Sequence, residues 1–120
     1  MIDLPDFKCV EFNCPCCGAN KMDKEFLWKL QRCRSIAGVP FKVNSGFRCK
    51  KHNADPKVGG KENSEHLIGM AADIAVLNSH TRFLILNAAF WVGFRRIGIY
   101  KTFVHLGNSN EHPQEVAWYG

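Results

Sequence analysis

Three side chains in this 120-residue sequence combine metal-binding types with a spacing that suits one divalent metal ion. His66 and Asp73 stand seven positions apart, with one glycine and two small alanines between them, and His105 follows in a second apolar segment. Two imidazoles and one carboxylate form a three-ligand set that leaves a fourth position for water. An open position of that kind separates a catalytic zinc site from a structural one. The sequence therefore predicts a metal centre at His66, Asp73 and His105.

Each of these residues also has an ordinary structural explanation. A lone histidine in an apolar strand, such as His105, is more often a hydrogen-bonded core residue than a metal ligand. Asp73 is harder to explain in this way, because it stands between Ala72 and Ile74 and a buried carboxylate without a cation or several donors is costly. The joint pattern therefore favours the metal.

The residues around these three side chains predict the elements that position them. Residues 71–76 predict a strand in which Asp73 faces away from the core, because successive side chains alternate between the two faces. Residues 97–100 and 103–106 predict two strands joined by a tight turn, which places His105 in a hairpin. His66 lies where a long loop, residues 49–70, meets the first strand. If the two strands are neighbours, the three side chains converge.

Two helices are expected to flank the strands. Asp23 can cap the first helix, which Gly38 ends, and Ser79 can cap the second, which Gly93 closes. Residues 41–48 alternate as a further strand.

Helices mixed along the chain with a small antiparallel sheet predict an α+β fold. We expect a single domain over residues 1–120, with an irregular cysteine-rich start over residues 1–20. Trp118 and Tyr119 are expected to pack back on this domain.

Composition and charge narrow the classes of partner. The net charge of +5 favours an anionic partner, such as nucleic acid, a membrane surface or bacterial cell wall, although solubility alone explains it equally well. The basic residues are spread along the chain, which argues against a dedicated nucleic-acid arm. No apolar run of about 18 residues predicts a membrane span. The acidic amino terminus does not resemble a secretory signal, so we expect cytoplasmic synthesis.

The six cysteines are expected to be reduced thiols or metal ligands rather than a disulfide framework. They are Cys9, Cys14, Cys16, Cys17, Cys33 and Cys49. The spacing of Cys14 and Cys17 is half of a structural zinc site, which Cys9, Cys33 or Cys49 could complete. Buried free thiols, or a disulfide formed after release from the cell, are the alternatives. A small zinc-finger-like nucleic-acid binder is therefore a further hypothesis, although no recognisable recognition element supports it.

The run Ser64-x-His66-x-x-Gly69-x-Ala71-x-Asp73 resembles the signature of the M15 family of zinc D-alanyl-D-alanine peptidases. That family includes phage endolysins and shares a fold with the hedgehog amino-terminal domain. Residues 45–48 (SGFR), 52–53 (HN), 58–60 (VGG) and 63–64 (NS) are similar to its compact branch, as are residues 97–100 (IGIY) and 103–105 (FVH). The resemblance by motif covers residues 40–107.

The resemblance implies a zinc cofactor held by His66, Asp73 and His105, and a zinc-activated water that attacks the scissile carbonyl. Arg48 would hold a substrate carboxylate or the developing oxyanion, which suits its planar fork. Ser64 would hydrogen-bond the peptide. The implied substrate is the D-amino-acid-containing peptide of bacterial peptidoglycan, cut by a carboxypeptidase or an endopeptidase. We further expect a monomer of phage or prophage origin that acts on the wall after release or as part of the virion.

Two positions depart from the family pattern. Many members carry an acidic general base three residues before the last zinc histidine, where this chain has Thr102. The compact branch often has an aspartate where this chain has Gly107. Proton transfer is then left without an assigned residue. Possible substitutes are Glu62, Glu65, Glu111 and His112. The alternative function is a metal-bearing domain that binds cell-wall peptide with little or no hydrolysis.

Overall fold

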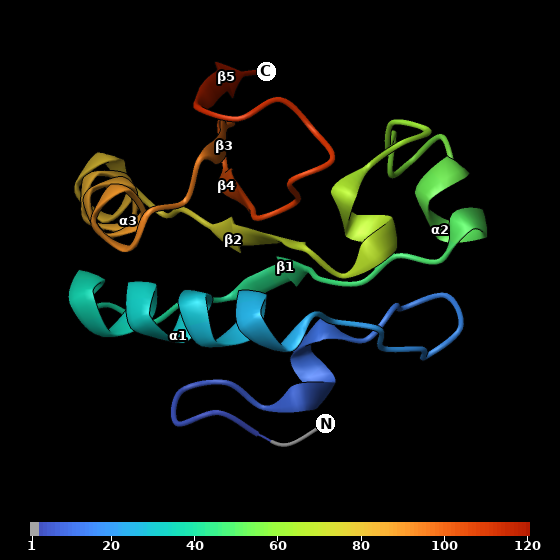
Figure 1. Cartoon of the computed structure of the whole chain (residues 1–120), viewed down its shortest axis with the longest axis horizontal. Helices are drawn as coiled ribbons and strands as arrows, with labels where there is room; N and C mark the ends of the chain where they lie inside the picture. The colour runs from blue at the N-terminus through green and yellow to red at the C-terminus, as the bar shows by residue number, and fades with distance from the viewer. Residues whose placement is uncertain (1–2) are drawn as a thin grey trace.

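A five-stranded sheet with its two long helices on one face forms the frame of the molecule, in a computed structural model that describes residues 3–120 (Figure 1). The helices are α1 (Lys24–Ala37), α2 (Lys50–Ala54) and α3 (Ser79–Val92), with 3-10 turns η1 (Cys9–Phe12) and η2 (Glu65–Ile68). The strands are β1 (Val43–Ser45), β2 (Ala71–Ala75), β3 (Arg96–Ile99), β4 (Phe103–Gly107) and β5 (Val116–Tyr119). Their order in the sheet is β1-β2-β4-β3-β5. The arrangement confirms the predicted α+β class.

The two strands that carry Asp73 and His105 are neighbours in this sheet. β2 and β4 pair antiparallel, and their register sets Asp73 directly opposite His105. β3 and β4 form the predicted hairpin, in which the Tyr100 amide donates to the Phe103 carbonyl. We predicted an antiparallel sheet, but the sheet is mixed, because β5 pairs parallel with β3. The tail thus packs back by adding a strand, although the Tyr119 side chain stays exposed.

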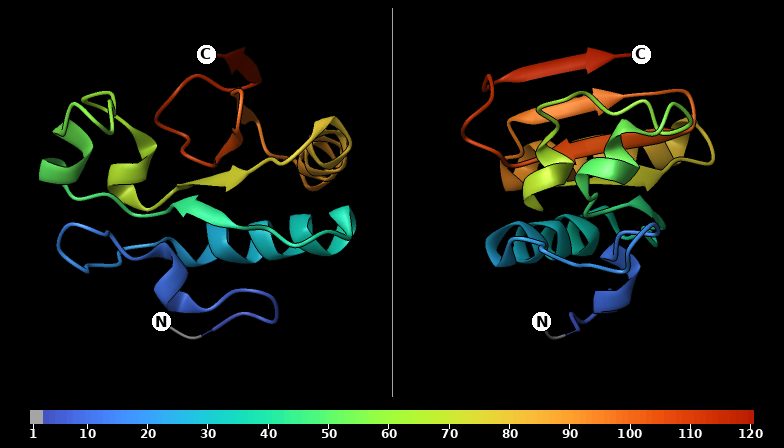
Figure 2. Two further views of the ribbon diagram at one scale, coloured as in Figure 1. Left: turned by 180° about the vertical axis from the view of Figure 1, so that it is seen from behind. Right: turned by 90° about the vertical axis from the view of Figure 1, so that its right-hand side faces the viewer.

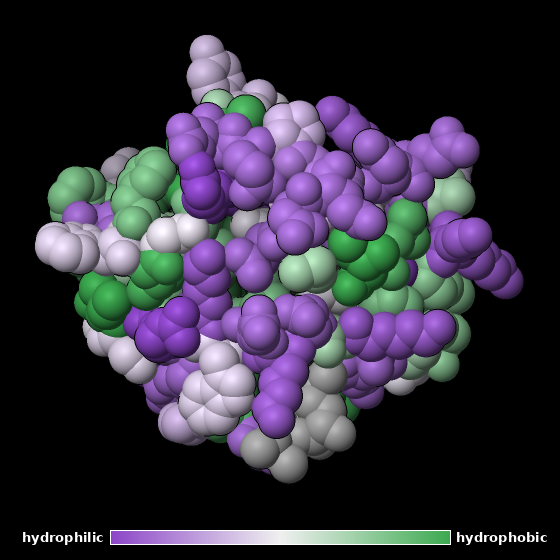
Figure 3. Space-filling view, in the orientation of Figure 1, coloured by the Kyte–Doolittle hydropathy of each residue, from purple (hydrophilic) through white to green (hydrophobic). Residues whose placement is uncertain are grey.

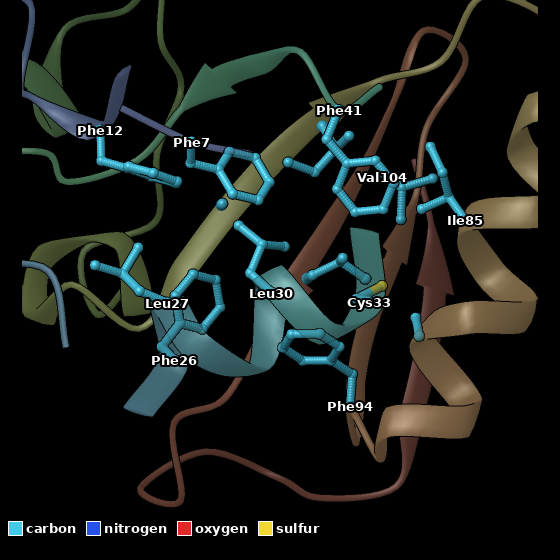
Figure 4. Packing of buried hydrophobic residues seen from close by; sticks show 14 of the residues in the cluster. Phe7, Phe12, Phe26, Leu27, Leu30, Cys33, Phe41, Ile85, Phe94 and Val104 are labelled. Atoms are coloured by element: carbon cyan, nitrogen blue, oxygen red, sulfur yellow. The ribbon is translucent and has the colours of Figure 1, made fainter. Parts of the chain in front are cut away.

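Alternation along β2 and β4 separates a core face from a site face. Ile74 and Val104 are fully buried and contact the helices, while Asp73 and His105 point to the other face. Phe26 and Leu30 of α1 belong to the same buried cluster as Val104 of β4 and Ile85 of α3 (Figure 4). Burial of these aliphatic and aromatic side chains supplies the main stabilisation of the sheet.

Helix boundaries agree closely with the capping signals in the sequence. The Asp23 carboxylate accepts a hydrogen bond from the Phe26 amide at the start of α1, as predicted. At α3 the cap is Asn78 rather than Ser79, because the Asn78 side chain accepts from the Thr81 amide. Ser79 becomes the first helical residue.

The segment over residues 41–70 is more ordered than the sequence suggested. β1 covers only three residues instead of the predicted strand over 41–48. The predicted long loop over residues 49–70 contains α2 and η2, so that prediction was wrong in part. The first turn of α2 begins at Cys49, whose side chain accepts from the His52 amide. The Cys49 and Ser64 side chains cap α2 and η2 and so stabilise these short helices. Such caps are weak signals among the glycines of this segment, so the sequence did not reveal them.

The amino-terminal segment, here residues 3–20, forms a layer beneath α1 and β1 (Figure 2). It contains one 3-10 turn, η1, and buries Phe7 and Phe12 against the core. A Cβ at Gly46 would clash with the backbone of Phe12, so the two segments are in direct contact.

The described residues include no helix that is both long and apolar enough to cross a membrane. Polar side chains dominate the face shown in Figure 3, where hydrophobic ones gather over α3 and in a second patch on the side of η2 and α2. Helix α3 exposes Phe83, Phe90 and Trp91.

Gly69 ends η2 in the left-handed conformation, with φ of 69°, and a Cβ there would clash with the backbone carbonyl of Lys21. We therefore predict that Gly69→Ala destabilises the protein far more than Gly59→Ala. Gly59 also has a positive φ, of 65°, but open space around it, so its substitution carries only the left-handed strain of about 1–2 kcal/mol. Urea unfolding of both variants checks this, and equal losses would contradict the contact with Lys21.

Candidate metal centre

The structure brings the three expected ligands together on the site face of the sheet. One donor atom from each of His66, Asp73 and His105 lies within 4.8 Å of the other two. The Oδ1 atom of Asp73 is 3.2 Å from Nε2 of His66 and 3.0 Å from Nδ1 of His105. His66 comes from η2, and the other two residues come from adjacent strands. Three donors that are distant in the chain therefore point at one place.

The second nitrogen of each imidazole is held by an acceptor. Nδ1 of His66 donates to the carbonyl of Gly46 at 2.7 Å. Nε2 of His105 donates to the carboxylate of Glu65 at 2.6 Å. The donor roles follow from the partners, since a carbonyl and a carboxylate can only accept. Both lone pairs are thus directed toward Asp73, as in metal sites where a second acceptor fixes the tautomer of each histidine ligand.

Glu65 is buried, with 2% of its surface exposed, and serves as the acceptor for several groups besides His105. Its carboxylate oxygens accept from Nε of Arg96, at 3.1 Å each, and Oε1 accepts from the Ser109 amide at 3.2 Å. A Cβ at position 107 would clash with this carboxylate. Glu65 therefore occupies the space that a side chain at Gly107 would need, and it places a carboxylate where the sequence lacked one.

Arg48 braces the carboxylate of Asp73 from the other side. Its Nη2 atom donates to Oδ2 of Asp73 at 3.0 Å. Nε donates to Oγ of Ser45 at 2.9 Å, and Nη1 to Oδ1 of Asn53 at 3.3 Å. Ser45 and Asn53 were not predicted as site residues, although both belong to the motifs on which the family resemblance was based. The guanidinium is thus fixed by three residues from β1, α2 and β2.

Ser64 caps η2 rather than standing free. Its Oγ accepts a hydrogen bond from the His66 amide at 3.2 Å, so it helps to orient the turn that carries His66. The side chain also lines the pocket described below. Its hydroxyl hydrogen can still be donated to a ligand.

Electrostatics at the site favour ionised carboxylates. Burial alone would raise the pKa of Asp73, but its close contacts with the rings of His105 and His66 outweigh it and hold that pKa below its usual range. For Glu65, burial likewise acts upward, and its contacts with His105 and Arg96 bring the pKa down. Burial lowers the pKa of His66. For His105, burial is outweighed by the two carboxylates, which raise the pKa.

These charges suit a divalent cation. Asp73 is an ionised, buried carboxylate, and both histidines direct a ring nitrogen at the same oxygen atom. A cation among these donors satisfies all three, whereas a buried carboxylate without one is costly. Imidazole nitrogen and carboxylate oxygen are donors that zinc accepts at about 2.0–2.2 Å. The donor set therefore fits zinc.

The three donors line a pocket of about 530 Å³ on the site face. One wall comes from the glycine-containing segment over residues 58–61 and the other from β3, β4 and β5. Gly98 makes the second wall possible, because a Cβ there would clash with the ring of Trp118. That ring lies 5.4 Å from the ring of His105, and its Nε1 donates to the hydroxyl of Tyr100. Access to the metal donors is therefore shaped by aromatic side chains.

The residues considered as a general base either lie outside the pocket or are already hydrogen-bonded to neighbours. Thr102 is exposed in the hairpin turn, and neither Glu62 nor Glu111 lines the pocket. His112 does line it, but its Nδ1 is 2.7 Å from Oγ of Ser109 and its Nε2 is 2.6 Å from the Asn63 carbonyl. Glu65 is bound as described above. Among the described pocket residues, both carboxylates, those of Asp73 and Glu65, are thus already bound by neighbours.

The contact between Glu65 and His105 predicts a specific loss of metal affinity. Glu65→Gln should weaken zinc binding at this centre about 10- to 100-fold, as expected for an outer partner of a histidine ligand. Glu62→Gln is the control, because Glu62 is exposed and lies outside the pocket. Competition with a fluorescent zinc chelator measures both affinities. Unchanged affinity in Glu65→Gln would show that this carboxylate does not support the centre.

Comparison with known proteins agrees with this geometry. A zinc D-Ala-D-Ala carboxypeptidase from Streptomyces albus G is 47% identical over 49 residues. The aligned part is 40% of this chain and 18% of that protein, so the chain spans less than a fifth of the length of this relative. The model of the Peptidase M15 family matches residues 5–107. This match covers most of the sequence, including His66, Asp73 and His105, and the chain therefore belongs to the peptidase M15 family.

Proposed function

We propose that this protein is a zinc-dependent peptidase that cleaves D-amino-acid-containing peptides of bacterial peptidoglycan, with His66, Asp73 and His105 as the zinc ligands. The observation that carries the proposal is the convergence of these three donors at the wall of an open pocket. A three-ligand set that faces a pocket leaves room for both water and substrate. The family membership and the name of the Streptomyces relative point to the same chemistry.

Zinc, when bound, would polarise the scissile carbonyl and lower the pKa of a water molecule. The chain's own residues have supporting roles. Glu65 and the Gly46 carbonyl hold the two imidazoles in the tautomers that direct their lone pairs to the centre. Arg48 donates to Oδ2 of Asp73 and holds the carboxylate in place. These contacts fix the donors before substrate arrives, so little reorganisation is needed.

Arg48 is the residue that we propose for substrate contact. Three of its five N–H groups bind Ser45, Asn53 and Asp73, which leaves two for a ligand. The guanidinium lines the pocket beside the three proposed ligands, where it can donate two hydrogen bonds to a carboxylate or an oxyanion. Ser64 lines the same pocket and can donate its hydroxyl hydrogen to the peptide.

The proposed site of action follows from the substrate. The protein would reach the wall after release from the cell or as part of a virion. Arg48 and Arg96 in the pocket lining are paired with Asp73 and Glu65. Lys61 adds a further positive charge, which suits a peptide that ends in a carboxylate. The wall formed by residues 58–61 is partly exposed, so the pocket is compatible with either a carboxypeptidase or an endopeptidase.

One observation favours a second candidate function. Both carboxylates that line the pocket in the described residues are bound by neighbours, and a general base normally needs a free lone pair within hydrogen-bond reach of the water. A domain that binds zinc and wall peptide, but hydrolyses it slowly or not at all, would have this arrangement.

Digestion of purified peptidoglycan separates the two functions. A peptidase should release new amino groups, with free D-alanine if it is a carboxypeptidase and without it if it is an endopeptidase. Removal of the metal by a chelator should abolish the release, and added zinc should restore it. Sedimentation with cell walls without any new amino group would instead support the binding domain.

Two substitutions separate metal binding from turnover. His66→Ala should bind one zinc equivalent fewer than the wild type, because it removes a donor. Arg48→Ala should retain this zinc but lose turnover about 100-fold or more, as expected when a charge-stabilising donor is removed. Metal analysis and the amine-release assay check both variants. Full zinc content in His66→Ala would exclude this residue as a ligand, and normal turnover in Arg48→Ala would exclude the proposed role of the guanidinium.

A further inference from the structure

A second group of metal-binding side chains lies outside the pocket. The sulfur atoms of Cys14, Cys17 and Cys49 all lie within 4.8 Å of one another. None of the three residues lines the pocket at the first centre. Cys14 and Cys17 belong to the amino-terminal segment, and Cys49 follows Arg48 at the start of α2. The proposed peptidase function uses none of them.

The amino-terminal half of this group is a compact turn. The Cys14 amide donates to the Ala19 carbonyl, and the Gly18 amide donates back to the Cys14 carbonyl, both at 2.8 Å. Gly18 has a φ of 75°, which a glycine adopts without strain. The turn therefore presents Cys14 and Cys17 on one side, as metal-binding C-x-x-C turns do.

Backbone amides surround the sulfur of the buried Cys14. The Cys49 amide donates to it at 3.4 Å, and the amides of Cys16 and Cys17 are also directed at it. The His52 amide donates to the sulfur of Cys49 at 3.4 Å. Hydrogen bonds of this kind stabilise a thiolate, which is the form that binds metals.

The remaining cysteines divide clearly between this group and other sites. Cys16 is exposed in the same turn and lies near Cys49 but outside the 4.8 Å group, so a rotation of its side chain would bring in a fourth sulfur. Cys33 is fully buried in the hydrophobic core, where burial raises its pKa to about 12. The sulfur of Cys9 accepts from the side chain of Asn20 instead. Of the three residues that the sequence left open as partners of Cys14 and Cys17, only Cys49 is in place.

Three unbonded sulfur atoms within 4.8 Å of one another fit a shared metal ion better than a disulfide. In a tetrahedral zinc site with Zn–S bonds of about 2.3 Å, neighbouring sulfurs are about 3.8 Å apart. A disulfide requires about 2.0 Å and joins only two of the sulfurs, which would leave the third thiol unpaired. All six cysteines are free in this structure.

We propose that Cys14, Cys17 and Cys49 bind a second, structural zinc ion, with Cys16 as the fourth ligand. A four-sulfur set leaves no position for water, so this ion has no catalytic role. It joins the amino-terminal segment to the residue after Arg48. The same two segments already meet where the Phe47 amide donates to the Phe12 carbonyl at 2.9 Å. The second zinc would therefore fix the backbone next to Arg48 on the side away from the pocket.

Cobalt substitution distinguishes the two centres, because the first contains no sulfur. Reduced, metal-depleted protein titrated with Co²⁺ should develop intense thiolate-to-cobalt charge-transfer absorption that saturates at one equivalent. His66→Ala should keep this absorption in full, so the result does not depend on the proposed peptidase function. Absence of this absorption in the wild-type protein would overturn the proposal. So would a protein that, after non-reducing purification, has no cysteine-bound metal and a mass two daltons low because of a disulfide.

Substitution of single cysteines identifies the ligands. Cys17→Ser, at an exposed position, should lose the charge-transfer absorption and one zinc equivalent. Cys9→Ser is the matched control from the same segment and should keep both. If Cys17→Ser fails to fold, a thiol-specific mercurial added to the wild type should release one zinc equivalent to an indicator. Retention of full absorption in Cys17→Ser, or no mercurial-released zinc, would contradict the assignment.

Discussion

The buried carboxylate of Asp73 is the constraint around which the site face is organised. It lies inside a sheet, with 5% of its residue surface exposed, and must be matched by positive charge or donors. His66 and His105 converge on one of its oxygens, and Arg48 binds the other. Because the imidazoles are themselves fixed by Gly46 and Glu65, the arrangement is held open on one side only, toward the pocket. A metal ion is the partner that satisfies all of these groups together.

The sheet supplies this arrangement through a single row of paired residues. Ser45, Asp73, His105, Gly98 and Trp118 are aligned across the five strands. Their contributions differ, because Ser45 binds Arg48, Gly98 leaves space, and Trp118 covers His105. Positions 65 and 107 likewise have complementary roles, because one leaves space and the other fills it. A glycine at 107 clears the space in which the Glu65 carboxylate reaches His105 and Arg96, so the charge is kept although the residue that supplies it lies elsewhere in the chain.

The sequence predicted the parts of this structure that depend on local patterns. Alternation placed Asp73 opposite the core, and the two-residue turn placed His105 in a hairpin. The cap at Asp23 and the end at Gly38 followed from side-chain chemistry alone. The sequence could not reveal that Glu65 fills the space beside Gly107, since that depends on how η2 packs against β4. It also could not choose Cys49 over Cys9 and Cys33, because the choice depends on how α2 approaches the amino-terminal turn. The parallel pairing of β5 was missed because nothing local distinguishes it from an antiparallel edge.

Anomalous diffraction at the zinc absorption edge, from crystals of the protein grown with zinc, tests the central claim most directly. The account predicts a strong peak within bonding distance of Nε2 of His66, Nδ1 of His105 and a carboxylate oxygen of Asp73. An anomalous map without a peak among these three side chains, or side chains that point apart in the same crystals, would contradict it.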